Sequence, residues 1–487
     1  MHVVFVTPEV SPFAKSGELA DFSASLPKYL AGLGMDVSLF MPRYRRPEID
    51  SMVLEKVGSS LSVPVGSDNF KADIYKCEMG KFEVHFVDNP KYFLRDNIYG
   101  TGTGEFLDND ERFIFFNRAI LEFLTGGSKP VDILHCNNWP TALIPVFLKT
   151  HYRNSFPLKN TASVLTLHNI AFQGSFPPET LSLTGLNWDY FNSGKLAFNG
   201  QVNFLKAGLI YADVFNTVSS TYKRAIMTAK HGFGLQDILR GKKDVFFSIR
   251  NGIDCETWNP ETDPYLVSNY RPGEIEKKRN NKRDLIKEFE GSISFDVPLI
   301  GLVSYMSAPK GFDILAEAME DLMSLDIGLV ILGRGEERYE KLMKSYQKKY
   351  PKNMAVKLDM SPALIHKVAA GADLLLIPSL YEPCGLNQLY GFRYGTVPIV
   401  RNTGGLGETV KHFSKKTRKG NGFVFKEYSA ASLLAAVKEA LDCYHKPACW
   451  RKLIKAGPTE NFSWERAAKR YLRLYHKAYQ LRRRRKY

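Results

Sequence analysis

The sequence predicts an α/β protein in which two doubly wound parallel sheets follow one another along the chain. Short apolar runs alternate with helical patterns, this alternation restarts after about residue 295, and a turn-rich segment separates the two halves. The chain has 487 residues, and at roughly 100–200 residues per domain this favours more than one core. Its 44% apolar and 24% charged residues are ordinary globular values, which exclude wholesale disorder, collagen and coiled coil.

The first half opens with a pattern typical of strand, helix and strand. Residues 2–6 are an apolar run, residues 19–33 carry apolar side chains at helical spacing, and residues 36–41 are apolar again after Gly34. Further strands are predicted at 132–134, 162–167 and 214–218, and helices at 109–124 and 141–149. Such alternation favours a parallel sheet with helices on both faces.

The second half repeats the pattern. Predicted strands lie at 298–303, 327–332, 355–358, 374–378 and 397–400. Between the halves, Asn251-Gly252-Ile253-Asp254 is a turn signal followed by a segment rich in Pro, Asp and Gly, so we expect a hinge at 250–262. The predicted domains are Rossmann-like units at 1–252 and 253–460.

The net charge of +15 is compatible with a nucleic acid, an anionic membrane surface or an anionic small substrate. Much of the charge lies in runs at 277–283, 341–352 and 482–486, which we interpret as solvated helix faces and a frayed tail. No RNA-binding signature, zinc-finger spacing or basic region before heptads occurs, so no nucleic acid is expected as a partner. No membrane partner is expected either, and a weak anionic tether is the less favoured interpretation of the tail.

Two further features concern location and cysteine chemistry. No apolar run approaches the roughly 18 residues that span a bilayer, and the opening apolar run is too short for a signal peptide, so we expect a cytoplasmic protein. The six cysteines make no CxxC pair, and a chain of this size needs no disulfide framework. All six are therefore expected to be thiols.

Ligands of open parallel sheets bind outside the carboxyl ends of the strands. If two such sheets face each other, the active site is expected in the cleft between them. The loops expected to carry chemistry are 7–18, 135–140, 168–178, 304–311, 333–337, 378–388 and 401–406.

Three of these loops suit a phosphate group. Thr403-Gly404-Gly405-Leu406 lies between a predicted strand and helix, where amides and a helix start favour an anion such as a diphosphate, although an ordinary turn has the same pattern. Lys15 and Lys310 each precede a glycine and a helix, and each supplies a mobile cation. None of these loops matches GxGxxG or the P-loop, which disfavours a dinucleotide dehydrogenase or P-loop ATPase.

Other loops suit a sugar. Glu382 follows a buried strand, where its carboxylate can accept hydrogen bonds from hydroxyl groups, and Gly385 and Leu386 offer amides at the next helix start. Cys384 is interpreted as packing because no histidine is fixed beside it. His135 and His168 each end a strand, and several polar residues on one sheet edge favour a site. No metal or other cofactor is expected, since the sequence has no HExxH, Asp-x-Asp pair or Cys/His cluster.

Together these loops resemble the bacterial glycogen synthase and plant starch synthase family, retaining glucosyltransferases of the GT-B fold. The Glu-Pro-Cys-Gly-Leu run at 382–386 with Gln-Leu-Tyr-Gly at 388–391 is highly specific. The resemblance covers nearly the whole chain and also includes 7–10 with Lys15 and Gly17, 108–116, 167–174, 217–222, 232–235, 251–254, 258–260, 403–406 and 462–464.

The resemblance implies transfer of glucose from ADP-glucose, or UDP-glucose, to the non-reducing end of an α-1,4-glucan with retention of configuration. It also implies that 1–252 is the acceptor side, that 253–460 is the donor side, and that 461–487 forms a helix crossing back to the first domain with a basic tail. The implied catalytic residues are Lys15, His168, Lys310 and Glu382. The implied substrate-binding residues are Gly17, Asp21, Asn169, Tyr305, Cys384, Gly385, Leu386, Thr403, Gly404 and Gly405.

The sequence departs from the family pattern at three places. Tyr305 stands where the family has an arginine that pairs with the diphosphate, and tyrosine gives no bidentate, permanently charged contact. Glu18 replaces a glycine, and Asn138 replaces an aspartate. Arg334 or Arg401 is a candidate substitute cation.

These departures leave two hypotheses. The first is an active α-glucan synthase. The second is a weakened or inactive homologue that binds glucan or nucleotide and acts as an initiation or regulatory partner. A related GT-B enzyme with another acceptor is disfavoured by the signature at 382–391.

Overall fold

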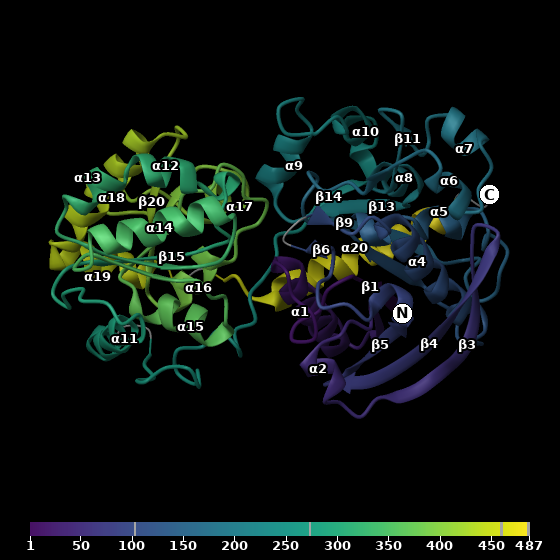
Figure 1. Cartoon of the computed structure of the whole chain (residues 1–487), viewed down its shortest axis with the longest axis horizontal. Helices are drawn as coiled ribbons and strands as arrows, with labels where there is room; N and C mark the ends of the chain where they lie inside the picture. The colour runs from purple at the N-terminus through teal and green to yellow at the C-terminus, as the bar shows by residue number, and fades with distance from the viewer. Residues whose placement is uncertain (102–103, 272–273, 458–460, 485–487) are drawn as a thin grey trace. The chain divides into compact units, whose positions relative to one another are not determined.

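The computed structural model describes residues 1–101, 104–271, 274–457 and 461–484, and it confirms the α/β class (Figure 1). The chain forms two compact units. Unit 1 comprises residues 1–218 and 223–251 together with helix α20 (Trp464–Arg484). Unit 2 comprises residues 219–222 and the described residues of 252–463.

Unit 1 is built on a sheet of nine described strands in the order β14-β13-β9-β8-β1-β2-β5-β4-β3. The strands from β14 to β5 are parallel neighbours, whereas β4 is antiparallel to both β5 and β3. Their bounds are β1 (His2–Val6), β2 (Asp36–Pro42), β3 (Glu55–Val65), β4 (Asp68–Met79), β5 (Phe82–Asp88), β8 (Ile133–Asn137), β9 (Ala162–Leu167), β13 (Val214–Thr217) and β14 (Phe246–Ser248).

The parallel strands β1, β2, β8, β9 and β13 lie where the sequence predicts strands. Their side chains are almost all buried, as expected when helices cover both faces. The hairpin of β3 and β4 was not predicted. Within β4 only Ala72 and Ile74 are buried, so this strand has no continuous apolar run of the kind that predicted the parallel strands.

Helices and short strands complete unit 1 (Figure 1). The helices are α1 (Glu18–Gly32), α2 (Pro47–Asp50), α3 (Pro90–Phe93), α4 (Asn109–Thr125), η1 (Trp139–Thr141), α5 (Ile144–Lys149), α6 (Thr180–Leu183), α7 (Asp189–Asn192), α8 (Phe204–Tyr211), α10 (Gln236–Gly241) and η2 (Lys243–Val245), and α9 (Ser220–Ile226) begins among residues of unit 2. The short strands are β6 (Gly100–Thr101), β7 (Gly104–Glu105), β10 (Ser175–Phe176), β11 (Ala197–Phe198) and β12 (Gln201–Asn203).

Helix α20 packs its apolar face onto unit 1. Trp464 and Tyr471 lie against Phe22 of α1, with ring centroids 5.5 and 5.9 Å apart. The Tyr475 hydroxyl lies 2.7 Å from Nδ1 of His135 in β8. The prediction of a frayed tail is wrong for residues 482–484, which are helical; residues 485–487 lie outside the described residues.

Unit 2 is built on a sheet of six described strands, all parallel, in the order β17-β16-β15-β18-β19-β20. The bounds are β15 (Leu299–Val303), β16 (Gly328–Leu332), β17 (Met354–Lys357), β18 (Leu374–Ile377), β19 (Val397–Arg401) and β20 (Phe423–Phe425). All but the short edge strand β20 were predicted. The helices are α11 (Ile275–Glu288), η3 (Ala308–Lys310), α12 (Phe312–Glu317), α13 (Met319–Met323), α14 (Glu337–Lys349), α15 (Pro362–Gly371), α16 (Asn387–Arg393), α17 (Gly404–Thr409), α18 (Ala430–Tyr444) and α19 (Pro447–Ala456).

The expectation of six thiols is wrong for one pair. Cys443 near the end of α18 and Cys449 in α19 form a disulfide, with their Cα atoms 5.6 Å apart. The short turn between the two helices brings these residues together although their spacing is not CxxC. The thiols are Cys77, Cys136, Cys255 and Cys384. Among the described helices, none has the length and apolar character needed to cross a bilayer.

Candidate functional site

Lys15 lies in the loop between β1 and α1. Its Nζ donates to both carboxylate oxygens of Asp21, each 2.8 Å away. The Lys15 side chain is 42% exposed, so the ammonium is held on the surface of the loop. This places two of the predicted site residues, Lys15 and Asp21, in one ion pair.

The backbone of the same loop is organised by Glu9, a buried residue for which the 7–10 motif alone indicated no role. Its Oε2 accepts from the amides of Ser16 and Gly17 at 2.6 and 3.3 Å, and its Oε1 accepts from the Tyr99 hydroxyl at 2.7 Å. The Gly17 amide therefore has an internal acceptor. Lys15 supplies a positively charged side chain on the surface of the same loop.

His168 follows β9, and hydrogen bonds hold both its backbone amide and its ring. Its amide donates to Asn138 Oδ1 at 2.8 Å, and its Nε2 lies 3.0 Å from Asn137 Oδ1. Asn137 Nδ2 donates to the Val6 carbonyl, which orients the amide oxygen towards His168. Since an amide oxygen only accepts, the ring proton is assigned to Nε2.

Burial lowers the pKa of His168 to about 3. The imidazole is therefore neutral at physiological pH. It packs edge-on against Phe22, with ring centroids 4.4 Å apart. A neutral ring fixed in this way can exchange hydrogen bonds with a sugar but cannot supply a positive charge.

Asn138, the departure from aspartate, occupies an unusual backbone conformation. Its φ of 57° and ψ of −172° lie in a region that is nearly restricted to glycine. The side chain still accepts the His168 amide bond, so the asparagine keeps the acceptor and loses the charge. The adjacent Asn169 uses its Oδ1 to accept from the Ala171 amide at 3.0 Å.

In unit 2, Lys310 and Glu382 form a second ion pair at the ends of β15 and β18. Lys310 Nζ lies 2.8 Å from Glu382 Oε2, to which Ser379 Oγ also donates at 3.2 Å. Glu382 is only 6% exposed, whereas the Lys310 side chain is 33% exposed. The Leu380 amide donates to the Pro309 carbonyl at 2.9 Å, which ties the two loops together.

The glycine pair 404–405 packs directly under Glu382. A Cβ at Gly404 would lie 1.8 Å from the Glu382 carbonyl oxygen, and one at Gly405 would lie 1.7 Å from that of Cys384. The Gly405 amide donates to the Glu382 carbonyl at 3.1 Å. Within unit 2 this amide therefore holds the Glu382 loop, and α17 begins at Gly404, with Thr403 as its N-cap. Diphosphate binding by residues 403–406 stays a prediction.

Cys384, Gly385 and Leu386 continue from Glu382 to the start of α16. The Cys384 thiol is buried, and Gly385 has a φ of 68°, which favours glycine. Gln388 Nε2 donates to the Gly385 carbonyl at 2.6 Å. Leu386 is the N-cap of α16, so these residues connect Glu382 to the start of that helix.

Three further residues concern the positive charge near this edge. Tyr305 follows β15 and is 57% exposed. The Arg401 guanidinium donates to the carbonyls of Ser379, Leu380 and Lys426, so it is engaged by the backbone. Arg334 follows β16, is exposed, and donates through Nε to the Leu358 carbonyl at 3.0 Å.

The predicted site residues thus form two groups, each at the carboxyl edge of its own sheet. The first contains Lys15, Gly17, Asp21, His168 and Asn169. The second contains Tyr305, Lys310, Glu382, 384–386 and 403–405. His135 belongs to neither, because β8 continues to Asn137 and buries its ring between Tyr475 and Thr166, which lowers its pKa well below the usual value.

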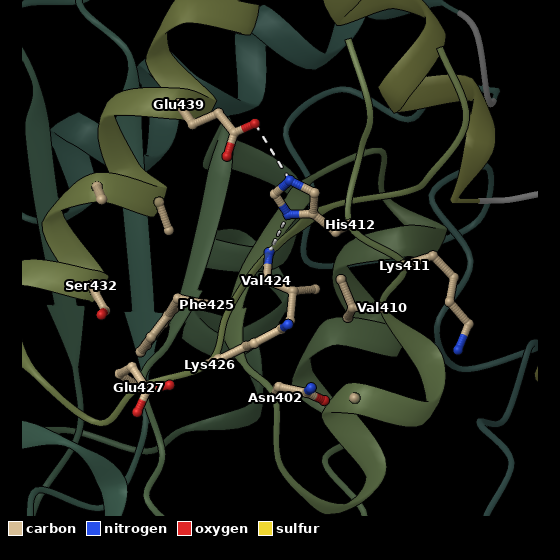
Figure 2. Close-up of a pocket in the computed structure, with 13 residues that line it drawn as sticks. Asn402, Val410, Lys411, His412, Val424, Phe425, Lys426, Glu427, Ser432 and Glu439 are labelled. Carbon is tan, nitrogen blue, oxygen red and sulfur yellow. Dashed lines mark hydrogen bonds and ion pairs between the residues drawn. The ribbon is translucent and has the colours of Figure 1, made fainter. Parts of the chain in front are cut away.

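A separate pocket of about 720 Å³ lies beside α17 in unit 2 (Figure 2). His412 crosses it, with Nε2 3.4 Å from Glu439 Oε1 and Nδ1 accepting from the Val424 amide at 3.2 Å. Asn402 is also part of its lining, but none of the predicted site residues is. We assign it no role in the reaction.

Two consecutive Rossmann-like units, with charged and glycine-packed loops on their strand ends, define the GT-B class of glycosyltransferases. Residues 2–241 match a family model described as starch synthase catalytic domain, and residues 286–456 match glycosyl transferases group 1. The sequence is 42% identical to a glycogen synthase from Koribacter versatilis, with 99% of each chain covered. It is 41% identical to one from Thermotoga maritima, with 98% of this chain and 99% of the relative covered.

The fold is also similar to solved structures. The catalytic domain of starch synthase IV from Arabidopsis thaliana, bound to ADP and acarbose, matches with a TM-score of 0.90 and 29% identity over 98% of this chain and 99% of that chain. The chain belongs to the glycogen synthase family and is a hexosyltransferase.

Proposed function

We propose that the chain is an active glycogen synthase that transfers glucose from ADP-glucose, or UDP-glucose, to the non-reducing end of an α-1,4-glucan with retention of configuration. The observation that carries this proposal is the Lys310–Glu382 ion pair, built on the glycine pair that packs beneath it. The relatives named glycogen synthase support the reaction. The ADP and acarbose bound to starch synthase IV support a nucleotide donor and a glucan acceptor.

The proposed chemistry needs stabilisation of two opposite charges. As the glycosidic bond to the donor breaks, negative charge develops on the diphosphate and positive charge on the sugar ring. Fixed cations and dipoles stabilise such charges more effectively than water does, because they need no reorganisation. Lys15 and Lys310 are proposed to act on the diphosphate, and the Glu382 carboxylate on the sugar.

The remaining predicted residues are proposed to position the substrates. His168, neutral and held by Asn137 and Asn138, would hydrogen-bond the transferred glucose. Gly405, whose amide holds the Glu382 loop, is proposed to bind the diphosphate together with Thr403 and Gly404. The other proposed substrate-binding residues are Gly17, Asp21, Asn169, Tyr305, Cys384, Gly385 and Leu386.

The test is incorporation of labelled glucose into glycogen from ADP-glucose and from UDP-glucose. The proposal expects incorporation from at least one donor, and release of the label by an exo-acting, α-1,4-specific hydrolase. The donor with the larger kcat/KM identifies the nucleotide preference. A protein that binds ADP and glycogen but incorporates no label from either donor contradicts the proposal and leaves the binding-partner hypothesis, which Tyr305 and Glu18 favour.

A further inference from the structure

The described cations on the carboxyl edge of the unit 2 sheet are largely engaged. Lys310 is paired with Glu382, so the two side chains together carry no net charge. Arg401 donates to three backbone carbonyls. Tyr305 is exposed but neutral. A nucleoside diphosphate sugar brings two negative charges, so a further cation is needed beside Lys310.

We propose that Arg334 supplies this cation and binds the diphosphate of the donor. This inference rests on the proposed function and names the residue that recognises the substrate's charge. Three observations carry it: the position of Arg334 on the sheet edge, the rigid support of its backbone, and the state of its guanidinium.

Arg334 and Tyr305 follow neighbouring parallel strands. β15 and β16 pair in register up to Val303 and Leu332. Beyond the strand ends, the Ser304 amide donates to the Leu332 carbonyl at 3.1 Å, and the Met306 amide donates to the Arg334 carbonyl at 2.7 Å. Arg334 therefore projects from the loop next to the one that ends in Lys310.

The backbone around Arg334 is packed too closely to shift freely. A Cβ at Gly333 would lie 2.0 Å from the Ser304 carbonyl oxygen, and one at Gly335 would lie 2.2 Å from that of Met306. The Gly335 amide also donates to Glu340 Oε1 at 2.7 Å. Because both flanking residues are glycines, the loop packs closely against residues 304–306. This packing fixes the position of the Arg334 backbone, from which the side chain extends.

The Arg334 guanidinium is exposed and carries one hydrogen bond, from Nε to the Leu358 carbonyl. Within the described part of the chain it makes no ion pair, unlike Arg338, which lies 2.7 Å from Glu336 Oε2. Its two terminal nitrogens keep the planar fork that suits bidentate contact with phosphate oxygens. The terminal nitrogens of the Arg334 guanidinium are therefore accessible to phosphate oxygens.

The test compares Arg334→Ala with Arg338→Ala, which removes the same charge from the first turn of α14. ADP and adenosine affinities are measured by calorimetry, alongside kcat/KM for the nucleotide sugar. A lost charge-assisted contact should weaken ADP binding on the order of 10–100-fold. Adenosine affinity should not change, and Arg338→Ala should bind ADP as wild type does.

A second comparison uses the neighbouring position. If Arg334 provides the missing cation, Tyr305→Arg in the Arg334→Ala background should recover most of the lost ADP affinity, and Arg334→Lys should lose less than Arg334→Ala. The inference about Arg334 is overturned if Arg334→Ala binds ADP with wild-type affinity, or if Arg338→Ala loses as much affinity as Arg334→Ala. Neither result affects the proposed function, provided that the wild type transfers glucose. A wild type that neither binds ADP nor transfers glucose overturns the proposed function itself.

Discussion

The two units hold their lysines in different ways. Lys15 pairs with Asp21 on the surface of unit 1, where both side chains are partly exposed. Lys310 pairs with the almost fully buried carboxylate of Glu382. The backbone of the Glu382 loop packs so closely on Gly404 and Gly405 that neither glycine has room for a Cβ. Exposed pairs are screened and contribute little to stability, whereas an acceptor left buried without its partner is costly. The Lys310–Glu382 pair is therefore the pre-organised one of the two, and the Lys15–Asp21 pair is the adaptable one.

Gly405→Ala should have the largest effect among the variants that test this comparison. The new Cβ would lie 1.7 Å from the Cys384 carbonyl oxygen, so the Glu382 loop must move. A displacement of about 1 Å can lower the rate about 10²-fold. The rate of glucose incorporation at saturating substrate measures the effect. Gly32→Ala in α1, whose Cβ would meet nothing within 4 Å, is the control and should keep wild-type activity.

Lys310→Met should cost more stability than Lys15→Met. Among the described residues, removal of Lys310 leaves the Ser379 hydroxyl as the side-chain donor to the buried Glu382 carboxylate. We expect the free energy of unfolding to fall by about 1–3 kcal/mol. For Lys15→Met, which breaks an exposed pair, we expect a change below about 1 kcal/mol. Urea denaturation measures both. Equal losses would remove the distinction between the two pairs.

His168 should make stability fall in acid. Burial lowers its pKa in the folded protein to about 3 from the ordinary value of 6.5, so between these two pH values the unfolded chain binds a proton that the folded chain does not. Stability from this group is complete above about pH 6.5 and decreases as the pH falls towards 3, by up to about 1.4 kcal/mol per pH unit. His168→Gln should flatten the dependence of unfolding free energy on pH. An unchanged slope would show that the ring is not held neutral.

Much of the fold could be predicted because buried parallel strands leave continuous apolar runs. β1 and β9 match their predicted bounds, and β15 and β16 differ from theirs by one residue. The β3–β4 hairpin was missed because most residues of β4 are partly or fully exposed, so the strand has no continuous apolar run. The Cys443–Cys449 bond was missed because the turn between α18 and α19, rather than the sequence spacing, brings the sulfurs together.

The candidate site also contains features that could be predicted from the sequence and features that could not. Lys310 and Glu382 could be found because each follows a buried strand, and the structure joins them at 2.8 Å. The use of the Gly17 and Gly405 amides within the protein could not be found, because it depends on Glu9 and on the Glu382 carbonyl folding back onto those loops. A glycine-rich loop predicts that another group approaches its backbone closely. It does not indicate whether that group is a ligand or another part of the chain.

We propose that the buried Glu382 carboxylate, held by Lys310, is essential for glucose transfer. The most direct measurement is incorporation of labelled glucose into glycogen by wild type and Glu382→Gln, with the exposed Glu337→Gln as control. Glutamine preserves the shape and one acceptor oxygen, so the fold should persist while activity falls at least about 10²-fold. Wild-type incorporation by Glu382→Gln would contradict the account.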